Sequence, residues 1–328
     1  MKTNRTKQDG FVVIVVLCMV VMLSVLLLAF NQESRANLQE VEDFRQSAQA
    51  LNCARAGLNI AIAAAKNSAG TEFDESPEHL FSGGKTIALD QGQCSLTVSE
   101  ETGKINVNLL KEESGKLNRT SIDHLLRLID MVNLDGAGDF HIDYNIVPSI
   151  IDWIDSDDEV TTLPFIKHRN QGAESGYYGR SSTAHKCRNA PVETVEELIG
   201  VRGMSPEVLE RLRGYLTVYG DGKINLNSAS GFVLASLSEQ MDTTLARVII
   251  DRRKLKPFES VSELREIPGM NDGLYYEISR MLTVKPKDRY YNVTSRGDVD
   301  RLGRTVKAIV RINEKTSRIE VILYRELT

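Results

Sequence analysis

The longest apolar run of the chain lies close to its N-terminus. From Phe11 to Phe30 no residue is charged. Twenty residues of α-helix rise about 30 Å, which matches the hydrocarbon thickness of a bilayer. After Glu33, apolar residues recur at near-helical spacing up to residue 66, so the helix is expected to continue in amphipathic form. The pattern predicts one long N-terminal helix whose first part spans a membrane.

Alternating polar and apolar positions predict strands at both ends of the remaining sequence. Two are expected at 85–89 and 93–100, and three follow Lys287, with a hairpin turn at 298–303. Between them the pattern changes to short helices, expected at 122–131, 146–155, 195–199, 206–216, 231–237, 244–254, 261–266 and 274–282. Strands before and after a helical block predict an α+β fold, in which a small sheet unit is interrupted by a large helical insertion.

Two parts of the helical region are similar to each other. GKINVN at 103–108 matches GKINLN at 222–227, and VETVEEL at 192–198 matches FESVSEL at 258–264. In each copy a Ser or Thr precedes an acidic residue, which is typical of helix N-caps, and a later Gly can close the helix. The repeat predicts two related helical subdomains.

Charges beside the apolar run predict its orientation. Lys2, Arg5 and Lys7 precede the run, so the positive-inside rule puts the short N-terminal segment in the cytoplasm and the large remainder on the other side. A removable signal peptide is the alternative. Its apolar core usually has only ~7–15 residues and is followed by a small-residue cleavage motif, which is missing here. The sequence favours an uncleaved anchor.

Composition and motifs exclude several function classes. The net charge of -5 opposes a broad basic surface for nucleic acid. The sequence has no C-x-x-C, G-x-S-x-G, P-loop or H-E-x-x-H motif. We therefore expect a protein that is not an enzyme.

The junction between Gly10 and Phe11 resembles the processing site of type IV prepilins and pseudopilins. A short basic leader, a Gly, a Phe and an apolar run follow one another there. The resemblance implies that a prepilin peptidase cuts after Gly10 and leaves Phe11 as a methylated amino terminus. A plain anchor with an incidental Gly is the alternative. Most such proteins carry Glu at the fifth mature position, where this chain has Val15, and that departure is known for one minor pseudopilin.

Longer motifs resemble the protein K (GspK) family of type II secretion systems. They are GKINVN, SIIDWIDSDDEV, GAESGYYG, VEELIGVRGMSPEVLERLRGYLTV and GKINLNSAS. The resemblance implies a type IV pilin-like fold with a large inserted α-helical domain that holds two SAM-like or helix-hairpin-helix-like subdomains. The expected divisions are a leader at 1–10, a transmembrane segment at 11–30, a pilin-like helix and first strands at 31–104, helical subdomains at 105–222 and 223–286, and closing strands at 287–328.

The same resemblance implies a function. The chain would be a minor pseudopilin at the tip of the periplasmic pseudopilus, where it initiates assembly and aids protein export. Its expected partners are the other minor pseudopilins, the prepilin peptidase and the inner membrane. It would cross that membrane once, with its C-terminal domain in the periplasm.

The acidic segment IIDWIDSDDEV is the best metal candidate. Five acids lie within eight positions there: Asp152, Asp155, Asp157, Asp158 and Glu159. Hard oxygen donors at this density suit Ca²⁺, and like charges so close repel unless a cation or a basic partner intervenes. Glu174 is a candidate distant ligand, whereas an exposed acidic loop is the alternative. Because the protein K family binds calcium in its helical domain, the resemblance favours as ligands Asp155, Asp157, Asp158 and Glu174.

Residues 224–284 also resemble a helix-hairpin-helix module, which in some proteins binds DNA phosphates. The hairpins expected at 238–242 and 268–273 are acidic and oppose phosphate. One basic patch remains, formed by Arg252, Arg253, Lys254 and Lys256. Nucleic-acid binding is therefore not expected. A membrane-anchored DNA receptor and a minor pilin of a type IV pilus remain the alternative functions.

Three cysteines are expected outside the cytoplasm, where disulfides persist. These are Cys53, Cys94 and Cys187, and three cannot all pair within one chain. In a pilin-like fold, Cys53 on the helix and Cys94 on an early strand are candidates to meet. Pairing of Cys94 with Cys187 is the alternative.

Overall fold

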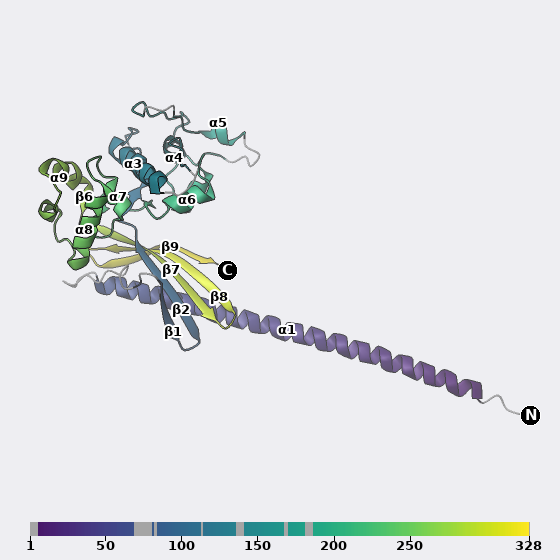
Figure 1. The fold of residues 1–328 in the computed structure, drawn as a ribbon. Coiled ribbons are helices and arrows are strands. Elements are labelled where there is room, and N and C mark those ends of the chain that lie inside the picture. The colour runs from purple at the N-terminus through teal and green to yellow at the C-terminus, as the bar shows by residue number, and fades with distance from the viewer. Residues whose placement is uncertain are drawn as a thin grey trace, which may run out of the picture.

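The structure is a computed structural model that describes residues 6–68, 81, 84–112, 114–135, 141–166, 170–180 and 186–327. A long helix, α1 (Thr6–Ser68), lies against an antiparallel sheet, and a helical region stands at one end of that sheet (Figure 1). The first five residues of the expected leader lie outside the described part of the chain.

Five strands form the sheet in the order β1-β2-β7-β8-β9, and every neighbouring pair is antiparallel. Their bounds are Lys85–Leu89 (β1), Gly92–Glu100 (β2), Asp288–Val299 (β7), Leu302–Asn313 (β8) and Arg318–Leu327 (β9). In β2, buried Cys94, Leu96 and Val98 alternate with more exposed residues, because successive side chains point to opposite faces. The long helix and the antiparallel sheet confirm the predicted α+β class, and the turn between β7 and β8 lies where the sequence predicts it.

Helix α1 has two parts with different surroundings. Nearly all side chains from Phe11 to Phe30 are exposed, and this part is long and apolar enough to cross a membrane. From Ala50 onward, one face of the helix is buried against the sheet. A Cβ at Gly297 of β7 would lie only 2.0 Å from the carbonyl oxygen of Ala50, so the close approach of helix and strand requires glycine there.

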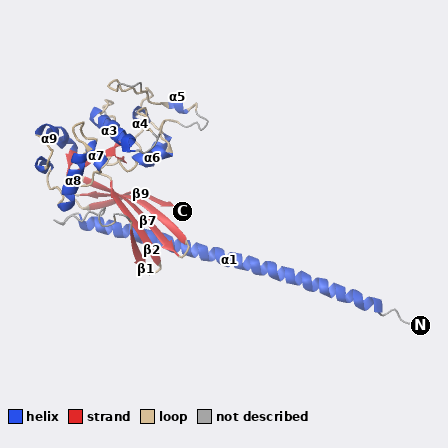
Figure 2. Ribbon diagram, in the orientation of Figure 1, coloured by secondary structure: helices blue, strands red, loops and turns tan. Residues whose placement is uncertain are grey.

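A large insertion separates β2 from β7, although these two strands are neighbours in the sheet. Its elements are β3 (Ile105–Asn106), η1 (Val107–Leu109), α3 (Arg119–Asp135), α4 (Ile146–Ile154), α5 (Ser175–Tyr178), η2 (Val195–Gly200), α6 (Pro206–Leu212), β4 (Leu216–Thr217), β5 (Ile224–Asn225), α7 (Gly231–Ala235), α8 (Thr243–Leu255), η3 (Val261–Glu266), α9 (Asp272–Ile278), η4 (Ser279–Met281) and β6 (Leu282–Thr283). Their apolar side chains form a hydrophobic core separate from the one between α1 and the sheet. Figure 2 shows these helices gathered at the end of the sheet away from the N-terminus.

The internal repeat has the same form twice. Strand β3 pairs in parallel with β4, and β5 pairs in parallel with β6. In the first copy, the Asn108 amide accepts from the backbone N–H of Val192 and donates to its carbonyl oxygen. In the second copy, Asn227 makes the same two hydrogen bonds with Phe258. We call each arrangement an asparagine clamp.

The predicted caps are also present in both copies. The backbone N–H of Thr194 donates to Glu197 Oε1 at the start of η2, and that of Ser260 donates to Glu263 Oε1 at the start of η3. These are the reciprocal bonds of a capping box, which satisfy N–H groups that the helix leaves unpaired.

For two helices, the predicted range extends beyond the C-terminal end of the helix in the structure. The helix expected at 206–216 ends at Leu212, and the one expected at 274–282 ends at Ile278 before a single 3₁₀ turn. Leu216 and Leu282 are strand residues instead. They pair with residues far away in the sequence, at the start of each copy, and helical spacing cannot reveal such a short, distant pairing.

The two copies meet where α3 packs on α7. Arg127 of α3 donates from Nη1 to the carbonyl oxygens of Ser236 and Leu237 at the end of α7. Burial, with the nearby Arg127 charge, lowers the pKa of His124 to about 4, although a hydrogen bond to the Leu237 backbone opposes this shift. His124 is therefore neutral at pH 7 and belongs to the contact between the copies.

Candidate metal centre

Helix α4 carries two carboxylates at its C-terminal end. Every residue from Ile146 to Ile154 is buried, and Pro148 lies in the first turn, where its missing N–H is tolerated. Asp152 lies in the last turn, and Asp155 caps the helix in an extended conformation. Negative charges at a helix C-terminus oppose the helix dipole. The local field therefore favours a cation at this end of α4.

Glu174 joins these two residues in a buried carboxylate cluster. One oxygen from each of Asp152, Asp155 and Glu174 lies within 4.8 Å of the other two. Asp152 is 0%, Asp155 7% and Glu174 3% exposed. Among the described residues, Asp152 Oδ2, Asp155 Oδ1 and both carboxylate oxygens of Glu174 have no hydrogen-bond donor. Buried charged oxygens without a partner are costly, and a hard cation such as Ca²⁺ would satisfy them.

Hydrogen bonds hold the other oxygens of the two aspartates. The backbone N–H of Thr161 donates to Asp152 Oδ1 at 2.9 Å. Lys111 Nζ donates to Asp155 Oδ2 at 2.6 Å and to Asp157 Oδ2 at 2.7 Å. Each buried aspartate thus has one fixed oxygen and one oxygen left for a ligand.

The pKa values of the clustered carboxyl groups are raised, as expected for buried acids that lie close together. Burial, together with the charges of Asp152, Asp155 and Asp158, raises the pKa of Glu174 to about 8. Burial also raises the pKa of Asp152 and of Asp155, although Thr161 and Lys111 partly oppose it. The Lys111 ammonium lowers the pKa of Asp157. A divalent cation would stabilise all of these carboxylates in their charged form.

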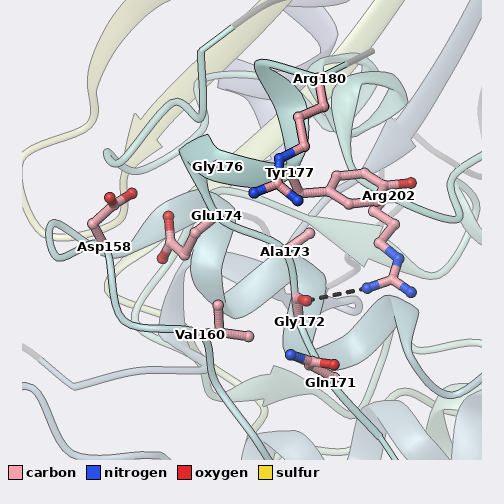
Figure 3. A pocket seen from close by; sticks show the side chains of 10 residues that line it. All are labelled: Asp158, Val160, Gln171, Gly172, Ala173, Glu174, Gly176, Tyr177, Arg180 and Arg202. Carbon is pink, nitrogen blue, oxygen red and sulfur yellow. Dashed lines mark hydrogen bonds between the residues drawn. The ribbon is translucent and has the colours of Figure 1, made fainter.

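Gly172 fixes the position of the Asp152 carboxylate. A Cβ at Gly172 would lie 2.1 Å from Asp152 Oδ2, so only glycine leaves room for this oxygen. Next to the cluster, a cavity of about 610 Å³ opens to solvent. Figure 3 shows the carboxylates of Asp158 and Glu174 on the left and the guanidinium group of Arg202 on the right, with that of Arg180 between them beside Tyr177.

The structure brings together some of the predicted ligands. Asp155 and Glu174 lie in the cluster, and Asp158 lines the adjoining cavity. Asp157 instead pairs with Lys111. Asp152, which was not among the preferred ligands, is the third member of the cluster. In the helix expected at 146–155, its spacing of three residues before Asp155 puts both side chains on the same face, and this could have identified it.

The other predicted site residues lie on α1 and β2. Gly10 and Phe11 both lie inside α1, in the chain before any cleavage. Cleavage between them stays a prediction. Cys53 and Cys94 are buried free thiols; burial raises the pKa of both, and for Cys94 the neighbouring Cys53 adds to this. Their pairing also stays a prediction. Cys187 lies in the core of the insertion, where its Sγ donates to the carbonyl oxygen of Asp152.

Comparison with known proteins covers the insertion from end to end. Two family models match, both described as type II secretion system protein K, at residues 103–221 and 224–285. Together they cover more than half of the chain. The chain belongs to the type II secretion system protein K family. The family confirms the resemblance found in the sequence and assigns the chain to the minor pseudopilins of type II secretion systems.

A solved protein K complex shows the same fold. A chain of the crystal structure of the GspK-GspI-GspJ complex from the enterotoxigenic Escherichia coli type 2 secretion system superposes with a TM-score of 0.68. The match covers 90% of this chain and 99% of that chain at 20% sequence identity. A search of curated protein sequences found no match.

Proposed function

We propose that the chain acts at the tip of a periplasmic pseudopilus, where it initiates assembly with other minor pseudopilins and so aids protein export across the outer membrane. The observation that carries this proposal is that the exposed apolar helix and the bulky helical insertion lie at opposite ends of the molecule (Figure 1). The role is scaffolding and needs no bond chemistry.

The position of the insertion supports the proposal that this subunit lies at the apex of the pseudopilus. Subunits of a filament stack through repeated head-to-tail contacts, so the distal end of one subunit meets the next. Here the insertion occupies the end of the sheet away from the N-terminus, where a further subunit would have to sit (Figure 2). Val15 supports the same position, because a subunit without a carboxylate there has no acid to pair with a neighbour's amino group inside the membrane.

The location test is direct. Gold-labelled antibody against the insertion is expected to mark pseudopili at one end only, whereas antibody against the major pseudopilin marks the whole shaft. Label from the insertion along the shaft would contradict the apical position. Co-purification of the full chain with the other minor pseudopilins from detergent-solubilised membranes tests the proposed partners.

The membrane arrangement follows from α1. We propose that the prepilin peptidase cuts after Gly10 and that Phe11 becomes a methylated amino terminus, while the sheet and the insertion face the periplasm. Amino-terminal sequencing of the membrane-extracted protein is expected to start at Phe11. An intact Met1, or a start beyond residue 30, would contradict this.

We also propose that Asp152, Asp155 and Glu174 hold a structural Ca²⁺, with Asp158 at its open side. The support is the set of buried carboxylate oxygens without donors. The ion would neutralise the C-terminal end of α4 and tie it to Glu174. A calcium titration of the detergent-solubilised full chain, followed by the fluorescence of its single Trp at position 153, tests this binding.

The basic patch gives little support to the alternative of a DNA receptor. Each of its cations already has a partner within the chain. Arg253 donates to the Leu226 and Ala229 carbonyl oxygens, and Arg252 pairs with Glu263. The remaining pairs are Lys254 with Asp251 and Lys256 with Glu259. Phosphate binding would have to break these contacts.

A further inference from the structure

We infer that the cavity beside the carboxylate cluster binds a carboxylate side chain of a protein segment, and that it does so only when the cluster holds its cation. The inference rests on the proposed calcium site and names a ligand for the surface next to it. Its volume of about 610 Å³ is within the range of ligand pockets.

The lining combines groups that suit such a ligand. Arg180 and Arg202 supply guanidinium groups, Tyr177 supplies a ring, and Val160 and Ala173 supply apolar surface (Figure 3). The Arg202 guanidinium lies 4.9 Å from the centre of the Tyr177 ring, and its Nη1 donates to the Gly172 carbonyl oxygen. These contacts orient Arg202, and a guanidinium held in this way is a strong donor to carboxylate.

Arg180 and Arg202 form no ion pair with any acid in the part of the chain that the structure describes. By contrast, Arg188, Arg213 and Arg252 all have one. The two positive charges are therefore available to an anionic group that enters the cavity.

The carboxylates on the opposite wall make binding conditional. Glu174 lines the cavity, is 3% exposed and has no donor on either oxygen, and Asp158 lies beside it. Without a cation, this wall offers an incoming carboxylate no positive charge, and the Asp158 carboxylate repels it. With a divalent cation in the cluster, the same wall attracts it, because Ca²⁺ takes six to eight oxygens and three carboxylates leave positions free. The cation and the ligand thus bind cooperatively, each raising the affinity for the other.

A carboxylate on a protein segment fits this lining better than a free small anion. The Tyr177 ring and the apolar side chains Val160 and Ala173 add a surface that a simple inorganic anion cannot use. An acidic residue next to an apolar one satisfies both parts of the cavity. The surface would therefore dock an acidic-apolar segment of another protein.

Titration with a matched pair of peptides tests the inference. The detergent-solubilised full chain is saturated with calcium, and the acetylated, amidated tetrapeptide Ala-Glu-Leu-Ala is added while the fluorescence of Trp153 is followed. The control peptide has Gln in place of Glu. Trp153 reports on this region because its ring packs edge-on against that of Tyr178, next to Tyr177, with centroids 5.1 Å apart.

The expected result is a preference for the Glu peptide by about tenfold, the worth of one charge-assisted hydrogen bond. Arg180→Gln is expected to lower the affinity for the Glu peptide by about the same factor. Arg213→Gln, which removes an exposed arginine that pairs with Glu210 outside the cavity, is expected to leave it unchanged. A chelator in place of calcium is expected to abolish binding.

Equal binding of the two peptides, unchanged binding by Arg180→Gln, or full binding in chelator would overturn the inference. Titration with calcium alone separates this result from the underlying proposal. If calcium binds and the peptides do not discriminate, only the carboxylate site fails. If calcium does not bind, the cation site and this inference both fail, and the co-purification experiment still tests the pseudopilin assignment independently.

Discussion

The two copies of the internal repeat share the same strand pairing and asparagine clamp, which we call the frame. They differ in the segment of chain that this frame encloses. Each copy starts with a short strand that pairs in parallel with a strand at its end, and each is closed by an asparagine clamp. The clamp in the first copy joins residues 84 positions apart, whereas the clamp in the second joins residues 31 positions apart. The frame is thus insensitive to the length of chain between its fixed points.

The candidate metal centre lies wholly in the longer enclosed segment. Asp152, Asp155 and Glu174 all fall between Asn108 and Val192, and the second copy has no counterpart of this cluster among its described residues. In the first copy α3, α4 and α5 are joined by long connections, so a smaller share of the enclosed segment is helical than in the second copy. A bound cation is a physical means of fixing such a segment, because coordination replaces part of the missing backbone pairing.

The largest expected effect comes from crowding the cluster. Gly172→Ala puts a Cβ against Asp152 Oδ2, so we expect a loss of about 3 kcal/mol in the free energy of unfolding, together with weaker calcium binding. Gly176→Ala is the matched control, because a Cβ there meets nothing within 4 Å. Denaturant titration of both variants measures the difference. Equal stability of the two variants would mean that the space around Asp152 is not constrained.

Calcium should stabilise the first copy selectively. At calcium concentrations 100-fold above Kd, the free energy of unfolding is expected to rise by about 2.7 kcal/mol relative to chelator. Glu174→Gln should remove this gain, while Glu239→Gln, an exposed acid of the second copy, should retain it. Thermal unfolding with calcium and with chelator provides the measurement. A gain that survives in the Glu174 variant would place the ion elsewhere.

The clamps should be worth similar amounts despite their different spans. Asn108→Ala and Asn227→Ala each leave a backbone N–H and a carbonyl group without their partner, so we expect a loss of about 2 kcal/mol for each. Unfolding of the two variants under the same conditions tests the shared frame. A loss that is much larger in the first copy would show that the clamp also supports the candidate metal centre.

Acid should weaken the contact between the copies. Because the folded-state pKa of His124 is about 4, below the ordinary 6.5, the neutral imidazole stabilises the fold above pH 6.5. This contribution is lost as the pH falls from 6.5 towards 4, by about 1.4 kcal/mol at pH 5.5. Between pH 7.5 and 5.5 the change in the free energy of unfolding should be less favourable by this amount in the wild type than in His124→Gln, because the other titrating groups, Glu174 among them, are common to both proteins. The same pH dependence in both proteins would assign it to other groups.

The sequence predicts the secondary structure of this molecule better than the side-chain contacts at the candidate metal centre. The long helix, the five strands and the capping boxes at Thr194 and Ser260 follow from local patterns, since each depends on residues close together in the chain. The acidic segment was also visible as a candidate site. Two facts were not predicted: Asp152 supplies the third carboxylate, and Lys111 pairs with Asp157. Lys111 lies 46 positions from Asp157, and only the tertiary fold brings such distant residues together.

The place where the insertion joins the sheet has a consequence for how this kind of subunit can vary. Glu100, the last residue of β2, is paired with Tyr291 of β7, so the chain departs and comes back at two points that are already side by side. The register of the sheet and its contact with α1 therefore do not depend on what lies between those points. The insertion can thus change in size without altering the way α1 packs on the sheet.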